Sequence, residues 1–306
     1  MILPVTRYTL IAAATALSAL SQSASPSTIV GAGYLFPASI NIAPGQIITV
    51  FATGVGSALT QPVFAGGGDL PTSLAGISVT LVQATEIPAP ILEVTPTLCA
   101  NCAVQTAITI QIPYQLQTVV SNGLGPSFEL FVTENGVAGH LSNLNPEPDQ
   151  VHILTVCDTV IGGSGSSTGR CQWEVTHANN TLVTTSSPAT VGEELVAYAV
   201  GLGATNPPVP TGQPAAQPTP TAETFTLAFN SPSATGVALA RAVAPLFTGL
   251  TPGYPGLYQI NFVVPPLPSG ALPCASNEAP VTANLTVSVV GSASSDGAGI
   301  CVSLPE

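Results

Sequence analysis

Two segments of this 306-residue chain carry the same glycine-bounded strand pattern. Residues 44–56 read PGQIITVFATGVG and residues 191–203 read VGEELVAYAVGLG. The glycines of the two segments align at one constant offset: Gly45, Gly54 and Gly56 with Gly192, Gly201 and Gly203. Such internal similarity predicts two copies of one structural unit.

Two further pairs of segments follow in the same order. The sequence APILEVTP at 89–96 matches APLFTGLTP at 244–252 with one insertion, and ITIQIP at 108–113 matches INFVVP at 260–265. Three matched segments in one order predict a duplicated domain. A duplication also lowers the expectation of a single asymmetric active site.

Domain limits follow from the repeats. The repeat unit covers about 41–139 and again about 188–295. We therefore expect a first domain at 30–187 and a second at 188–306. The intervening residues, 141–187, carry strand signals of their own and are expected to form a hairpin connection that packs on the first domain.

Strand signals dominate the chain after its N-terminal region. Apolar and polar residues alternate in three segments, which are 108–112, 128–133 and 285–289. This is the period of a strand with one buried face. Residues 47–52 and 195–200 are apolar on both faces, as in the central strands of a packed sandwich. The pattern predicts an all-β fold with Ile110 and Phe262 at equivalent core positions.

The chain is poor in charge. Charged residues make up 6% of it, against roughly 25% in ordinary soluble domains, and the formal net charge is −12. The sequence has no lysine, so its surface must be built from uncharged polar residues, glycine and proline. Such a chain repels phosphate backbones, which excludes nucleic acid as a partner, and it lacks the basic patch that anionic lipid attracts.

The N-terminus predicts export. Arg7 precedes an eleven-residue apolar run at 10–20, which is too short to span a bilayer. Ser21 and Ser23 fit a cleavage site, so we expect residues 1–24 to be a signal peptide. The alternatives are an uncleaved anchor and a buried helix. No other apolar run is long enough for a membrane span, which predicts an extracellular or cell-surface location.

Six cysteines agree with an oxidising compartment. Fifteen connectivities are possible in principle. Local pairing is favoured because each pair is close in the chain: Cys99 with Cys102, Cys157 with Cys171, and Cys274 with Cys301.

At this point the motifs resemble a known family. The segments 177–182, 188–203 and 256–265 are similar to those of an uncharacterised duplicated β-domain family found at the C-terminal end of many exported acidobacterial proteins, over about 40–290. The glycine-bounded strand also resembles the opening of IPT/TIG domains. The resemblance implies two tandem Ig-like β-sandwich domains, an extracellular location and no known enzymatic activity. The chain departs from the family by carrying Cys99-Ala-Asn-Cys102 and no large N-terminal partner domain.

Few motifs suggest chemistry. Residues 165–169 (GSSTG) fit the G-x-S-x-G pattern around Ser167, but the strand and helix that a nucleophile elbow needs are missing from the flanks. Cys99-x-x-Cys102 has redox spacing but lies between strands, so a structural disulfide is favoured.

The histidines and acids are scattered. The histidines, His140, His152 and His177, lack the spacing of a metal site and are expected at the surface or in turns, with His177 structural. Three acids lie in one connection: Glu147, Asp149 and Asp158. They are a weak indication of a calcium site. The default expectation is that they are surface carboxylates. Glu93 and Glu129 have no evident partner for carboxylate-pair catalysis.

Binding remains the favoured activity. Tyr254 is the exposed candidate for stacking on a sugar ring, whereas Trp173 is in phase with Val175 and is expected to face a core. Two long loops, 57–74 and 204–222, emerge from the same end of their sandwiches and are either binding loops or solvated connections. We expect an exported non-catalytic structural, adhesive or recognition protein without cofactor or metal, whose partner is an unknown surface protein or glycan. The alternatives are a carbohydrate-binding module and, more remotely, a secreted hydrolase.

Overall fold

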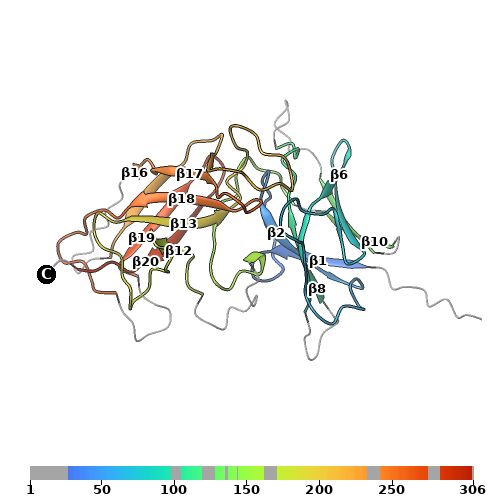
Figure 1. Ribbon diagram of the computed structural model, residues 1–306, viewed down its shortest axis with the longest axis horizontal. Coiled ribbons are helices and arrows are strands. Elements are labelled where there is room, and N and C mark those ends of the chain that lie inside the picture. Colours follow the sequence, from blue (N-terminus) through green and yellow to red (C-terminus); the bar gives the residue numbers. More distant parts are fainter. Residues whose placement is uncertain are drawn as a thin grey trace, which may run out of the picture.

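The structure is a computed structural model that describes residues 27–97, 105–118, 128–134, 137–142, 144–161, 171–232, 242–274 and 283–304. Its strands form four antiparallel sheets that pack in pairs as two β-sandwiches (Figure 1). The first sandwich is drawn from blue to green and the second from yellow to red. Within the described residues, the one helical element is the 3-10 turn Thr159–Ile161. No helix there is long and apolar enough to cross a membrane.

The first sandwich pairs a five-stranded sheet with a second sheet of equal size. The first sheet runs in the order β1 (Thr28–Gly33), β2 (Ile47–Thr53), β8 (Gln105–Gln111), β7 (Ile91–Thr97) and β3 (Val63–Phe64). The second sheet runs β10 (Val137–Ser142), β9 (Glu129–Glu134), β5 (Ile77–Val82) and β4 (Ser73–Leu74), and β6 (Glu86–Ala89) also pairs with β5.

The second sandwich repeats this plan. One sheet runs β11 (His152–Ile153), β13 (Glu194–Val200), β18 (Tyr258–Val263), β17 (Phe247–Leu250) and β14 (Thr219–Pro220), and β12 (Val175–His177) also pairs with β13. The other sheet runs β16 (Ala242–Val243), β15 (Thr226–Asn230), β19 (Leu285–Val290) and β20 (Ser295–Ile300).

Both sandwiches have the strand order of an immunoglobulin-like fold. In chain order, β1, β2, β5, β6, β7, β8, β9 and β10 occupy the positions A, B, C, C′, D, E, F and G, which gives one A-B-E-D sheet and one C′-C-F-G sheet. The second sandwich follows the same assignment from β11 and β12 through β20. The predicted all-β fold of two tandem Ig-like sandwiches is therefore confirmed.

The register of the central strands also agrees between the two copies. Ile48 of β2 faces Ile110 of β8, and Leu195 of β13 faces Phe262 of β18. Ile110 is 0% exposed and Phe262 is 2% exposed, so the two residues occupy equivalent core positions, as predicted. This match is what the alternating sequence requires, because a one-residue slip would turn every apolar side chain to the other face.

The connection between the repeats differs from the expectation. Both of its strands, β11 and β12, pair with β13 of the second sandwich. The prediction that residues 141–187 pack on the first domain is wrong for these strands. The physical reason is that β13 would otherwise present an unpaired edge, and the connection fills the position that β1 fills beside β2.

A small apolar cluster joins the sandwiches. Ile47 of β2, Val200 of β13, Leu154 and Val160 form its buried part, and Tyr34, which follows β1, packs against it. The cluster separates two larger cores, one inside each sandwich.

Candidate functional site

A pocket of about 550 Å³ opens at one end of the second sandwich. It lies where β13 begins and where β15 and β18 end, between the two sheets. Its floor is formed by core side chains, with the rings of Phe229 and Phe262 at a centroid distance of 5.8 Å and Leu285 beside them. The pocket therefore reaches into the hydrophobic core.

The rim of the pocket is aliphatic and exposed. Val191 is 42% exposed, Leu246 is 58% exposed and Val263 is 43% exposed. Among the described lining residues none carries an ionisable side chain. The hydroxyl of Ser231, the one polar side chain of that lining, donates to the carbonyl oxygen of Asn284 at 2.7 Å. The pocket thus offers shape and apolar surface rather than reactive groups.

The corresponding end of the first sandwich is closed. There, Gln111 accepts a hydrogen bond from the amide of Gly212 at 2.6 Å, and the amide of Tyr114 donates to Thr211 at 3.0 Å. The hydroxyl of Tyr114 lies 3.1 Å from that of Tyr258, and burial raises the pKa of Tyr114 to about 12. The second sandwich therefore covers this end of the first.

The proline-rich loop 204–222 makes much of this cover. Its Gln213 donates to Asp69 of the loop 57–74 at 3.2 Å, and Leu70 of that loop donates to the carbonyl oxygen of Gly212 at 2.8 Å. The two long loops that the sequence marked as candidate binding loops thus contact each other.

Tyr254 lies away from the pocket. Its side chain is 61% exposed in the turn between β17 and β18, at the opposite end of β18 from the pocket. No ring contact to Tyr254 occurs among the described residues. Trp173 packs against the core of the second sandwich, as expected.

His152 lies between two carboxylates at the junction of the sandwiches. Its Nε2 is 3.2 Å from Asp158 Oδ2, and its Nδ1 is 3.3 Å from Asp296 Oδ2. Burial by itself would lower the pKa of His152, but the hydrogen bonds to Asp158 and Asp296 outweigh it and raise the pKa. The expectation of a surface or turn histidine is wrong here, since only 20% of the side chain is exposed.

The acids of the connection serve as structural acceptors. Asp149 is fully buried and accepts hydrogen bonds from the amides of Ser292, Ala293 and Ser294 and from both serine hydroxyls. Asp158, also fully buried, accepts bonds from the amide and hydroxyl of Thr155. The default reading of these two acids as surface carboxylates is wrong. In the described part of the chain, no three His, Cys, Asp or Glu side chains are arranged so that they could hold a metal ion.

The remaining titratable candidates are His140, Glu93 and Glu129. His140 lies 3.5 Å from Glu129 on the exposed face of the β9–β10 hairpin. Glu93 accepts a hydrogen bond from Thr95, and burial raises its pKa. No second carboxylate in the described structure contacts Glu93 or Glu129, so the two do not form a catalytic pair there.

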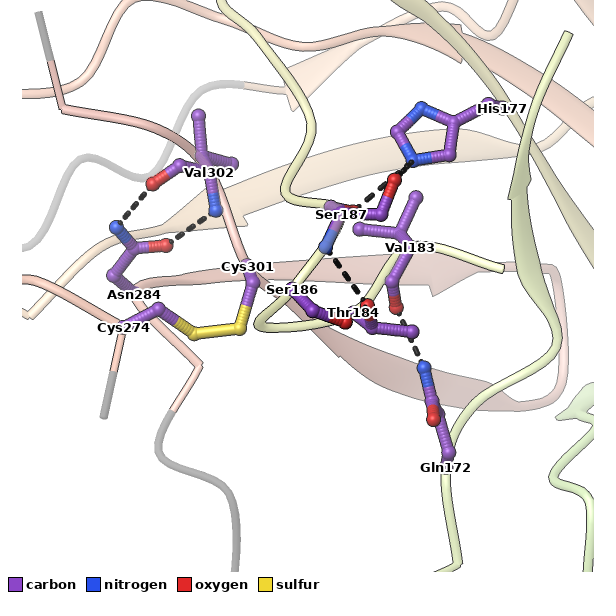
Figure 2. The surroundings of a disulfide bond; sticks show 10 residues. All are labelled: Gln172, His177, Val183, Thr184, Ser186, Ser187, Cys274, Asn284, Cys301 and Val302. Atoms are coloured by element: carbon purple, nitrogen blue, oxygen red, sulfur yellow. Dashed lines mark hydrogen bonds between the residues drawn. A yellow bond between two sulfur atoms is a disulfide. The ribbon is translucent and has the colours of Figure 1, made fainter. Parts of the chain in front are cut away.

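Ser187, His177 and Glu193 have the outline of a nucleophile–base–acid set. His177 Nδ1 is 2.5 Å from Glu193. Figure 2 shows the other side of the ring, where Nε2 is 3.3 Å from the Ser187 hydroxyl and 3.1 Å from the Ser187 carbonyl oxygen. An acceptor at 3.1 Å requires a proton on Nε2, whereas a general base needs a free lone pair there. The hydrogen bond to Glu193 also raises the pKa of His177. The arrangement favours a structural clamp.

Two of the expected disulfides are present. Cys157 joins Cys171 with a Cα–Cα distance of 5.3 Å, beside the antiparallel bridge of Thr155 with Trp173. Cys274 joins Cys301 at 5.5 Å, next to Asn284, whose side-chain amide pairs with both backbone groups of Val302 (Figure 2). The motifs Cys99-x-x-Cys102 and 165–169 and the leader lie outside the described residues.

Sequence reasoning missed the pocket and the His152 cluster. The pocket arises from chain segments that meet only in space, and its one sequence signal is the run Pro265-Pro266-Leu267-Pro268 after β18. His152 and Asp296 are far apart in the chain, so no local spacing could pair them.

Comparisons with known proteins add little. No family model matches the chain, and no curated protein matches its sequence. Among solved structures, the crystal structure of bovine butyrophilin is similar over 92% of this chain and 100% of its own, with 11% identity and a TM-score of 0.20. The fold assignment rests on strand order and register.

Proposed function

We propose that this chain is an exported, non-catalytic structural and recognition protein of the cell surface or extracellular matrix, and that it belongs to the duplicated β-domain family that it resembles. The observation that carries the proposal is the closed junction, in which Gln111 and Tyr114 of the first sandwich are bonded to Gly212, Thr211 and Tyr258. Such contacts hold two Ig-like units in tandem and leave one end of the second open.

Two lines support export. The disulfides Cys157–Cys171 and Cys274–Cys301 fit an oxidising compartment, and the sequence of residues 1–24 fits a signal peptide. Mass spectrometry of the protein from its native cells tests this. We expect the mature protein to begin near residue 24. We also expect protease added to intact cells to remove the protein from the cell surface. A cytosolic protein that retains residue 1 would contradict it.

The absence of catalysis has its own test. Ser187 is an exposed hydroxyl that faces a histidine, so it is the residue that a phosphonylating probe would modify. We expect no labelling by a fluorophosphonate probe and no ester hydrolysis above the rate of the Ser187→Ala variant. Labelling that requires both Ser187 and His177 would establish a hydrolase instead.

One observation favours the alternative of carbohydrate binding. Tyr254 is 61% exposed in the turn between β17 and β18, where its ring could stack on a sugar. A glycan array with the wild type and the Tyr254→Ala variant decides the matter. Binding by the wild type that the variant loses would support a glycan site, and no binding by either protein removes it.

A further inference from the structure

We infer that the pocket of the second sandwich binds an uncharged, largely aliphatic small molecule. Its volume of about 550 Å³ lies within the range of small-molecule sites, which are concave and mostly apolar. This inference goes beyond the proposed function, which requires only the junction and the surface of the tandem.

The depth of the pocket supports an occupant. Phe229, Phe262 and Leu285 belong to the core of the second sandwich, and they also form the floor of the open pocket. The side chains around an open pocket of this kind present apolar surface to water, and removing apolar surface from water is favourable. A ligand with an apolar body would cover this surface.

The residues that line the pocket indicate that the ligand is uncharged. The described lining holds no acidic, basic or histidine side chain, and the hydroxyl of Ser231 is already bonded to Asn284. A charged headgroup in this pocket would lose its hydration without gaining a partner. The net charge of −12 further disfavours an anion.

The backbone groups of the lining residues restrict the class of ligand further. Pro265, Pro266 and Pro268 lie in the lining and have no N–H groups to donate. The amides of Gly192 and Val264 are both used in backbone hydrogen bonds. These prolines and these two amides therefore offer no hydrogen-bond donor to a carboxylate, which favours an uncharged ligand such as a hydrocarbon or a fatty alcohol.

The repeat itself argues against a second copy of the chain as the occupant. In the first sandwich the equivalent end is covered through the side chains of Gln111 and Tyr114. The repeat alignment places Val263 and Pro266 at these positions in the second sandwich. Neither residue can make the same side-chain hydrogen bonds, so a copy could not repeat the junction.

Binding of the neutral fluorophore N-phenyl-1-naphthylamine to the whole mature protein tests the inference. We expect the fluorescence of this probe to be enhanced in a saturable way. 1-Decanol should reverse the enhancement, and decanoate at pH 8 should need an at least tenfold higher concentration to do so. Ala244→Trp, at the exposed mouth of the pocket, should weaken binding at least tenfold. Ala58→Trp, at an exposed site of the first sandwich, is the matched control and should leave binding unchanged.

A second pair of variants tests the same inference without relying on the folding of Ala244→Trp. Leu246→Asp places a charge at the mouth and should abolish binding, whereas Val30→Asp, at an exposed position of β1, should not. Absence of saturable binding, equal competition by decanoate, or full binding by both pocket variants would overturn the inference. A concentration-dependent dimer in light scattering that Ala244→Trp dissociates would overturn it in favour of a second copy.

Discussion

The phenol ring of Tyr34 lies flat against the imidazole of His152, with ring centroids 3.7 Å apart and an interplanar angle of 10°. Tyr34 follows β1 of the first sandwich, and His152 begins β11, which pairs with the second. The stacked pair thus bridges the two units. Gln46 donates to the Tyr34 hydroxyl at 2.6 Å, and the carboxylates of Asp158 and Asp296 hold the imidazole.

The stability of this junction should depend on pH. Because the pKa of His152 is raised in the folded protein, its contribution is complete below the ordinary histidine pKa of about 6.5 and is lost as pH rises through the folded value. We expect the free energy of unfolding of the wild type to fall across that range in urea titrations.

The His152→Gln variant should show a smaller fall with rising pH, because it has no imidazole to deprotonate. His177 also has a raised pKa, so part of the fall will remain in that variant. His140→Gln, which removes a histidine side chain that is 45% exposed, is the matched control. An identical slope in wild type and His152→Gln would contradict the charged state of His152.

Asp149 anchors the connection to the β19–β20 turn. Burial opposes its charge, but the hydrogen bonds from Ser294 and Ser292 outweigh burial and lower its pKa. Asp149→Asn puts an N–H₂ group where an acceptor is needed, and we expect a loss of about 2–3 kcal/mol in the free energy of unfolding near neutral pH. Glu147→Gln, two residues earlier, should change stability by less than about 0.5 kcal/mol.

The pH profile of the same variant gives a second readout. Because the pKa of Asp149 is lowered on folding, its stabilisation is lost as pH falls through the folded value. The difference between wild type and Asp149→Asn should therefore shrink at acidic pH. A difference that stays constant from neutral to acidic pH would show that the carboxylate charge is not what matters.

The fit of the junction can be probed at two glycines of one turn. Gly253 and Gly256 both have positive φ, at 83° and 67°. A Cβ on Gly256 would meet Ile47 and the carbonyl oxygen of Gly45, whereas a Cβ on Gly253 would meet nothing within 4 Å. Gly256→Ala should therefore cost about 1–3 kcal/mol more than Gly253→Ala, the typical cost of overpacking.

X-ray scattering in solution separates the junction from local strain. Gly256→Ala should increase the radius of gyration because the first sandwich is pushed away, and Gly253→Ala should not. Equal values for both variants and the wild type would mean that the sandwiches do not meet at Gly256.

The repeat and the alternating apolar residues were enough to predict two β-sandwiches and the equivalence of Ile110 with Phe262. Both are local properties, since strand period and glycine turns are written in consecutive residues. The place of β11 and β12 was not predictable in this way. Which sheet a connecting strand joins depends on which edge is open, and that is a property of the folded sheets.

The candidate site was predicted less well for the same reason. Asp149 and Asp158 looked like surface acids because their donors are supplied by residues that the sequence does not mark, such as the amides of 292–294. Among the described residues, Val263 and Pro266 line the pocket where the first sandwich has Gln111 and Tyr114, and the hydrogen bonds of those two side chains are visible only in the structure.

The two disulfides should each stabilise the protein through the loop they close. The paired cysteines are 14 residues apart for Cys157–Cys171 and 27 apart for Cys274–Cys301. Chain entropy then predicts a loss of about 3–4 kcal/mol when both cysteines of either pair are replaced by serine, with the larger loss for the longer loop. Denaturation of the two double variants in urea measures this.

The pairing itself is checked by peptide mapping of a non-reduced digest, which should link the same partners and also Cys99 to Cys102. Free thiols at all six positions would contradict export as well as pairing. A loss below about 1 kcal/mol for Cys274→Ser with Cys301→Ser would mean that Asn284, bonded to both backbone groups of Val302, holds this end of the sheet without the disulfide.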